Sequence, residues 1–265
     1  MELSMATDYA SDVGNAEPSL RRIAEAGFEH IQWIHHWRHD FIYTEPEIQH
    51  IARLLRDLNL SLYDIHAPVG AEKNWFSTTE YQRLAGVEIV KNRVAMCQTL
   101  GGSVVVTHVP EVVPENREHW GQLRKSLDEL ESFCTTRGVR IAIENRPYDE
   151  FDGIAELFSE YQPQYVGLCY DSGHGNIGGE GLAHLETFND RLVSLHLHDN
   201  DGTADRHQPL FTGTVDWRRL AGIISASPYH EFLTFETDMK FAQEQDELPF
   251  LKGAYRDGLR LLEMI

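Results

Sequence analysis

Cysteine is scarce in this sequence, and the cysteines present do not form a metal-binding or redox motif. Cys97, Cys134 and Cys169 are the three thiols among 265 residues, and no C-x-x-C pair occurs. Widely spaced thiols argue against a disulfide-stabilised scaffold and against a thiolate zinc finger. We therefore expect a protein of a reducing, cytoplasmic environment.

Long apolar runs and targeting signals are also lacking. No stretch of about 18 apolar residues is present, so no membrane-spanning helix is predicted. Residues 1–8 contain no basic region followed by an apolar one, so a secretory signal peptide is not expected. The chain is predicted to work without a membrane.

Basic residues are also few in this sequence. The chain carries 42 acidic residues against 23 Lys and Arg, which gives a formal net charge of −19. Attraction to a nucleic acid backbone requires a basic face, so no nucleic acid partner is expected unless a local patch or a bound metal reverses the field. Fourteen histidines stand out against this background.

Apolar segments alternate with amphipathic ones along the whole chain. Hydrophobic residues make up 42% of the sequence, enough for a large core, and residues 1–265 contain neither a repeat nor a linker. The predicted strands are 3–6, 30–34, 60–65, 104–108, 139–144, 166–171, a strand from Val193 onward, and 232–236. The predicted helices are 17–26, 45–58, 79–100, 115–137, 154–161, 217–226 and 248–263.

Eight strands separated by helices predict the fold. Short apolar strands are typical of a parallel sheet that is buried on both faces. Eight such units in a chain of this length favour a closed (β/α)8 TIM barrel, an α/β fold, in a single domain. A doubly wound open sheet is the alternative, but no glycine-rich phosphate-binding turn follows the first strand.

Metal-binding side chains recur at the C-terminal ends of six predicted strands. These residues are His66, His108, Glu144, Asp171, His196 and Glu236. The strand ends of a barrel meet at one mouth, where the active sites of this fold lie. Carboxylates and imidazoles together form an anionic pocket suited to Mn²⁺, Mg²⁺, Co²⁺ or Zn²⁺. Three further candidate ligands follow in the adjoining loops: His174, Asp205 and His207.

The seventh predicted strand ends in two histidines. His196 and His198 point to the same side of the strand, because alternate residues share a face. We expect His196 to be the metal ligand, with His198 as the alternative. If His198 is not a ligand, we expect it to hydrogen-bond the substrate or a ligating carboxylate.

Seven short motifs follow one another along the chain: His66-Ala-Pro, Thr107-His108, Ile143-Glu144-Asn145, Asp171-Ser-Gly-His174, His196-Leu-His-Asp199, Asp205-Arg-His207 and Phe235-Glu236-Thr237. In this order they resemble the xylose-isomerase-like TIM barrels, which include sugar isomerases, sugar epimerases and endonuclease IV (AP endonuclease family 2). The resemblance covers nearly the whole chain. It indicates the superfamily more specifically than the reaction.

The isomerase and epimerase branch implies one divalent metal held by Glu144, Asp171, His196 and Glu236. By this resemblance the two glutamates are also the catalytic acid–base pair, which exchanges a proton with carbon through a metal-stabilised enediolate. The expected substrate is a small sugar, polyol or sugar phosphate. Enzymes of this branch often form homo-oligomers.

Further residues are expected near the substrate. His174 resembles a ligand of a substrate oxygen. Glu150 resembles a carboxylate that supports the metal site, with a solvated acidic residue of the loop as the alternative. Trp33 begins the aromatic segment 33–39, which would stack on a sugar, pack as a loop on the rim of the barrel or form an oligomer contact. Arg206 is a candidate for binding a substrate phosphate or carboxylate, with a surface salt bridge as the alternative.

Endonuclease IV is the competing resemblance. Its three zinc ions have nine ligands, and all nine positions are matched here by His66, His108, Glu144, Asp171, His174, His196, Asp205, His207 and Glu236. This match implies a zinc phosphoester hydrolase with two or three metal ions. The acidic composition argues against DNA as the substrate, so a small phosphoester is the alternative substrate. A catalytically inactive binding protein is disfavoured, because every ligand position is filled.

Overall fold

The computed structural model of the chain describes residues 1–70, 72–147 and 151–265. Its strands are β1 (Glu2–Ala6), β2 (His30–Trp33), β3 (Ser61–His66), β4 (Val104–Thr107), β5 (Arg140–Glu144), β6 (Val166–Asp171), β7 (Leu192–His196) and β8 (Phe232–Phe235). Its α-helices are α1 (Glu17–Ala26), α2 (Glu45–Leu58), α3 (Glu80–Leu100), α4 (Arg117–Thr135), α5 (Phe151–Glu160), α6 (Ser172–Asn176), α7 (Gly181–Thr187), α8 (Trp217–Ala226) and α9 (Glu247–Leu262). Three short 3₁₀ helices, Pro114–Asn116, Asn189–Arg191 and Met239–Phe241, complete the elements of the described residues.

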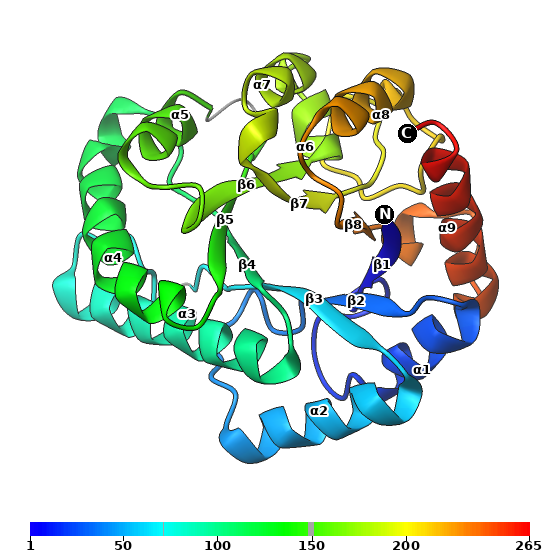
Figure 1. The fold of residues 1–265 in the computed structure, drawn as a ribbon, viewed down its shortest axis with the longest axis horizontal. Helices are drawn as coiled ribbons and strands as arrows, with labels where there is room; N and C mark the ends of the chain where they lie inside the picture. The colour runs from blue at the N-terminus through cyan, green and yellow to red at the C-terminus, as the bar shows by residue number, and fades with distance from the viewer. Residues whose placement is uncertain (71, 148–150) are drawn as a thin grey trace.

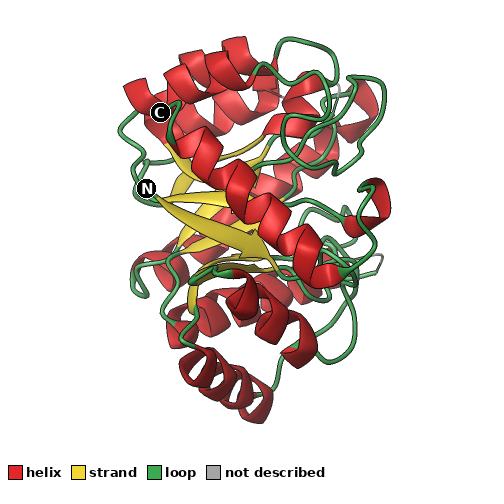
Figure 2. Cartoon of the chain, turned by 90° about the vertical axis from the view of Figure 1, so that its right-hand side faces the viewer, coloured by secondary structure: helices red, strands yellow, loops and turns green. Residues whose placement is uncertain are grey.

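The strands form one parallel sheet that curls into a barrel, with the order β7-β6-β5-β4-β3-β2-β1-β8. The last seam closes where Leu197 N donates to Thr234 O at 2.8 Å and Glu236 N donates to Leu197 O at 3.1 Å. Figure 1 shows the strands as a central ring with the helices around it, and Figure 2 shows the sheet between helices in side view. The predicted (β/α)8 barrel is therefore confirmed.

Local sequence signals account for most of the helix boundaries. At the start of α2, Thr44 and Glu47 form a capping box, which satisfies backbone N–H groups of the first turn. Helix α1 ends at Gly27 and α3 ends at Gly101, both in the left-handed conformation that glycine adopts without strain. These stops agree with the predicted helix ends.

The largest differences from the predicted elements follow β5 and β6. Helix α5 begins three residues before the predicted start at Ile154. Helices α6 and α7 were not predicted, because segments of five and seven residues are too short to show a helical hydrophobic period. Strand β7 ends at His196, so His198 lies beyond the strand.

Among the described residues, no helix is long and apolar enough to cross a membrane.

A layer of buried side chains lies beneath the mouth of the barrel. Strands have a period of two, so the residue two positions before each strand-end candidate shares its inward direction. These residues are Asp64, Val106, Ala142, Cys169, Ser194 and Thr234, and all are fully buried. The strand-end residues therefore rest on a packed floor.

The floor is polar beneath part of the mouth. Register shifts occur in the β2–β3 and β6–β7 pairings, and the residues paired after the shifts are Asp64 and Ser194. Ser194 Oγ donates a hydrogen bond to Asp64 Oδ2 at 2.5 Å across the barrel. Burial raises the pKa of Asp64 to about 6. These shifts place polar groups of β3 and β7 opposite one another.

The close approach of α3 to the loop before it yields a stability prediction. A methyl group on Gly86 would lie 2.3 Å from Trp75 N and 2.5 Å from Asn74 C, which are backbone atoms that cannot move cheaply. Gly86→Ala should therefore destabilise the fold by roughly 1–3 kcal/mol, as overpacking of a core does.

The exposed Gly222 of α8 provides the matched control, because no atom lies within 4 Å of the added methyl group. Gly222→Ala should stabilise the protein by roughly 0.5–1 kcal/mol, since alanine costs less backbone entropy in a helix. Urea unfolding of both variants measures the difference. Equal midpoints for the two variants would contradict the packing described here.

Candidate metal centre

Four strand-end residues meet at the mouth of the barrel. Glu144, Asp171, His196 and Glu236 come from the ends of β5, β6, β7 and β8, and one ligand atom of each lies within 4.8 Å of those of the others. The four side chains are buried, with at most 6% of any residue exposed. The structure thus brings together the residues that the strand spacing predicted to converge, and their role as ligands stays a prediction.

Glu144 lies between two sets of histidines. Its Oε2 is 3.0 Å from His66 Nε2 and 3.0 Å from His108 Nε2. Its Oε1 faces the opposite direction, 3.2 Å from His196 Nδ1. Each oxygen of this carboxylate therefore belongs to a different group of possible ligands, and Glu144 is placed to bridge them.

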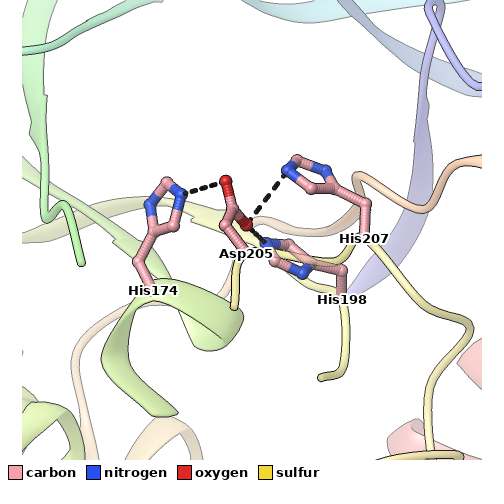
Figure 3. A group of neighbouring side chains, drawn as sticks. All are labelled: His174, His198, Asp205 and His207. Carbon is pink, nitrogen blue, oxygen red and sulfur yellow. Dashed lines mark hydrogen bonds and ion pairs between the residues drawn. The ribbon is translucent and has the colours of Figure 1, made fainter. Parts of the chain in front are cut away.

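A further group gathers around Asp205, as Figure 3 shows. His174 Nε2 lies 3.3 Å from Asp205 Oδ2, His207 Nε2 lies 3.4 Å from Oδ1, and His198 Nε2 lies 4.0 Å from the same Oδ1. The rings of His198 and His207 stack with their centroids 4.0 Å apart. The three histidines come from α6 and from the loop after β7, so Asp205 links these two segments.

Backbone hydrogen bonds fix the orientation of four of these imidazoles. In each, Nδ1 lies 2.7–3.3 Å from a carbonyl oxygen: His66 with Ala67, His174 with Asn145, His198 with Arg206, and His207 with Glu236. An Nδ1–H that donates to a carbonyl leaves the lone pair on Nε2. Each Nε2 then faces a carboxylate oxygen, another electron donor. Such pairs are stable only with a proton or a metal cation between them, and metal-bound histidines are held by this kind of outer hydrogen bond.

The pKa values of the buried groups also indicate that positive charge stabilises the pocket. Burial opposes ionisation, but His196 and His108 hold the pKa of Glu144 well below its usual range. His196 likewise lowers the pKa of Glu236 to about 2 against the effect of burial. Although burial favours a neutral ring, Asp205 and Glu236 raise the pKa of His207 to about 9. Glu144 and Glu236 are therefore ionised, and their charge requires cations beside them.

Unpaired buried atoms fit a metal ion at the four strand ends. Among the described residues, His196 Nδ1 and Glu236 Oε2 have no hydrogen-bond partner, although they lie 3.0 Å apart. One imidazole nitrogen and three carboxylates suit Mn²⁺, Mg²⁺, Co²⁺ or Zn²⁺. The donor set of the strand ends therefore matches the divalent metal that the sequence predicted.

His198 contacts a carboxylate, which is one of the roles that the sequence left open for it. Its Nε2 lies 3.0 Å from Asp171 Oδ1, so it contacts a carboxylate of the four strand-end residues. Arg206 pairs through Nη1 with Asp201 at 2.5 Å on the exposed side of the loop. A role of Arg206 in substrate binding stays a prediction.

The structure separates Trp33 from the metal ligands. Trp33 is buried, and its Nε1 donates to the hydroxyl of Tyr43 at 2.9 Å, in a region packed between α1 and α2. Its stacking on a sugar stays a prediction. Glu150, the predicted supporting carboxylate, lies outside the described residues.

Two residues near the mouth were not predicted individually. The ring of Trp37 lies 5.1 Å from that of His66 and 5.7 Å from that of His108, between centroids, so this tryptophan of the aromatic segment covers the histidines. Asp8 follows β1; burial and the charge of Glu236 raise its pKa to about 7. The rule that site residues follow strand ends would have found Asp8, had it been applied to the first strand.

Comparison with known proteins identifies the family. The family model of the xylose isomerase-like TIM barrel matches residues 20–263, and the chain belongs to this family. The uncharacterized protein y4fM of Sinorhizobium fredii is 33% identical over 276 aligned residues, which cover 93% of this chain and 88% of that protein.

Solved structures share the fold at lower identity. L-ribulose 3-epimerase superposes with a TM-score of 0.81 and 19% identity, covering 99% of this chain and 95% of the other. The IolI protein with a bound zinc atom superposes with a TM-score of 0.79 and 17% identity, covering 99% and 98%. These likenesses establish the common barrel.

The buried carboxylates predict that metal ions stabilise the protein. Removal of divalent ions with EDTA should lower the thermal unfolding midpoint, and Zn²⁺ or Mn²⁺ should restore it, because a cation relieves the repulsion among Glu144, Asp171 and Glu236. At a free ion concentration of 100 times Kd the gain is about 2.7 kcal/mol. Calorimetry measures the shift, and Asp171→Asn, which removes one charge at constant size, should reduce it. A midpoint that responds to neither EDTA nor added metal would contradict the metal centre.

Proposed function

We propose that the protein is a divalent-metal-dependent isomerase or epimerase of a small sugar, polyol or sugar phosphate. The observation that supports the proposal is that carboxylate oxygens of two glutamates lie close to the same imidazole nitrogen. Glu144 Oε1 lies 3.2 Å and Glu236 Oε2 lies 3.0 Å from His196 Nδ1. Two carboxylates thus approach one point from β5 and β8, on different sides of the mouth.

The pair has the properties of a proton-transfer couple. A bound divalent cation supplies the Lewis acidity that makes a proton beside a carbonyl removable. Glu144 and Glu236 have pKa values below the usual range, so both are ionised at neutral pH and either can accept a proton. One glutamate removes a proton from the substrate carbon, and the other returns a proton from its own side. Burial of both side chains limits exchange of that proton with water.

Neighbouring residues hold the pair and the substrate. His198 fixes the carboxylate of Asp171, and the backbone N–H of His174 donates to the same carboxylate at 2.7 Å. In this proposal His108 and His174 bind substrate hydroxyl groups, and Trp37, whose ring lies against that of His108, offers an apolar face to a sugar. Asp8 supplies a carboxyl group near Glu236 for further hydroxyls.

The comparisons support this proposal without determining the reaction. One superposed structure is named as an L-ribulose 3-epimerase, and another is described with bound zinc. Both likenesses lie below 20% identity, so the argument for proton transfer depends on the glutamates of this chain.

Glu236→Gln should abolish turnover while leaving the fold intact, because glutamine keeps the size of the side chain but cannot accept a proton at this position. General-base catalysis contributes typically 10²–10⁴-fold, so kcat with a panel of ketoses should fall by about that factor. Loss of tritium or deuterium from the substrate to solvent gives a second measure. Glu231→Gln, at an exposed glutamate before β8, is the matched control and should keep full activity. A fully active Glu236→Gln variant would remove this residue from the mechanism.

A phosphoester hydrolase is the second candidate, and the complete set of ligands favours it. Within the described residues, the three groups contain all nine residues of the endonuclease IV pattern, with Glu144 shared by two groups and His198 added to the third. Clustered metal ions activate water and stabilise a leaving oxygen. In the isomerase proposal, by contrast, the group around Asp205 keeps protons as its positive charge, in line with the raised pKa values of His174 and His207.

Metal content separates the two candidates. The isomerase proposal predicts about one tightly bound ion per chain in purified protein, whereas the hydrolase requires two or three. Mass spectrometry of the metals, together with hydrolysis of bis(p-nitrophenyl) phosphate, makes the measurement. Two or three ions per chain with phosphodiester cleavage and no action on ketoses would overturn the isomerase proposal.

A further inference from the structure

Gln32 of β2 lies inside the barrel against the ring of His196 from β7. Its side chain is fully buried, and its amide forms a hydrogen bond with His196 Nε2. We propose that Gln32 is a positioning residue that sets the tautomer of His196: its carbonyl oxygen accepts a hydrogen bond from Nε2–H and leaves the lone pair of Nδ1 for a metal ion. This inference depends on the metal site of the proposed function but not on its reaction.

The two orientations of the amide select different tautomers. When the amide nitrogen faces Nε2, that ring nitrogen must accept, so the ring proton lies on Nδ1 and points at the carboxylates of Glu144 and Glu236. When the amide oxygen faces Nε2, the proton lies on Nε2 and the Nδ1 lone pair faces those carboxylates. A cation can bind Nδ1 only in the second case.

Unpaired atoms favour the second orientation. Among the described residues, three buried atoms of this cluster have no hydrogen-bond partner: Gln32 Oε1, His196 Nδ1 and Glu236 Oε2. With the amide nitrogen toward the ring, Gln32 Oε1 remains unsatisfied in the buried interior, which is costly, and the proton on Nδ1 leaves no lone pair there for a cation. With the oxygen toward the ring and a cation at Nδ1, Oε1 accepts from Nε2–H, and the other two atoms bind the ion.

The location of Gln32 suits a rigid support. In β2, Gln32 pairs with Ala6 of β1 and with Asp64 of β3, so its backbone is held on both sides. The pairing with Asp64 follows the register shift in β2–β3. His196 differs in this respect from His66, His174, His198 and His207, whose Nδ1 atoms are oriented by backbone carbonyls. A side-chain amide performs for His196 what the main chain performs for those four.

Three variants test the inference. Gln32→Met keeps the approximate length of the side chain but removes the amide, and Gln32→Glu provides a carboxylate that accepts from Nε2–H. Ser126→Ala is the matched control, since Ser126 is another fully buried polar residue, in α4, whose hydroxyl pairs with Arg83 and with the carbonyl of Trp75. Zn²⁺ is titrated into each protein, and the ring nitrogens of His196 are followed by ¹⁵N NMR, so that ions bound elsewhere do not contribute to the signal.

The zinc-loaded wild type should carry the His196 proton on Nε2. The dissociation constant measured at His196 should rise 10–100-fold in Gln32→Met, the loss typical of a missing outer partner. It should change less than threefold in Gln32→Glu and in Ser126→Ala, since one keeps an acceptor and the other has its partners in Arg83 and Trp75. If Gln32→Met does not fold, the affinity and tautomer of Gln32→Glu decide the question.

Three outcomes would each overturn the inference. The first is equal zinc affinity in wild type and Gln32→Met, and the second is a proton on Nδ1 of His196 in the zinc-loaded protein. The third is a tenfold weaker zinc affinity in Gln32→Glu. Absence of zinc binding at His196 in the wild type would overturn it together with the proposed metal site. A protein that shows the predicted affinities but acts on no ketose would refute the isomerase proposal alone. Unfolding midpoints of the variants separate loss of the amide from general damage to the barrel.

Discussion

Compensation of buried negative charge is the constraint on which this structure depends. Glu144, Asp171 and Glu236 lie almost without solvent at the mouth of the barrel, where an unpaired carboxylate costs several kcal/mol. The histidines around them supply positive charge only when they carry a proton or share a metal ion. The position of every imidazole at the mouth, and of the groups that orient them, can be understood from this requirement.

The parallel barrel meets the requirement by simple geometry. Each strand delivers one side chain at its C-terminal end, and the residue two positions earlier supports it from below. Hydrogen bonds then determine which ring nitrogen of each histidine faces inward. Main-chain carbonyls orient His66, His174 and His207, and the Gln32 amide orients His196. The site is therefore preorganised by the strands and adjoining loops together.

The same residues are compatible with sugar isomerisation and with phosphoester hydrolysis. The protonation state of the group around Asp205 distinguishes the two reactions. If protons compensate Asp205, its histidines remain available to bind hydroxyl groups beside a single metal ion. If metal ions replace those protons, the cluster becomes suited to an attacking water and a leaving phosphate oxygen. Fold similarity to an L-ribulose 3-epimerase and to a zinc-bound protein establishes the shared barrel for both chemistries alike.

The sequence alone determined the alternation of strands and helices, and with it the barrel and the convergence of His66, His108, Glu144 and Asp171 on one mouth. These features follow from local periods and from spacing along the chain. Only the tertiary structure decided that His198 contacts Asp171 and that Gln32 contacts His196. Such contacts depend on register shifts and on the ends of strands distant in the chain, and no local period of the sequence records how those strands are aligned.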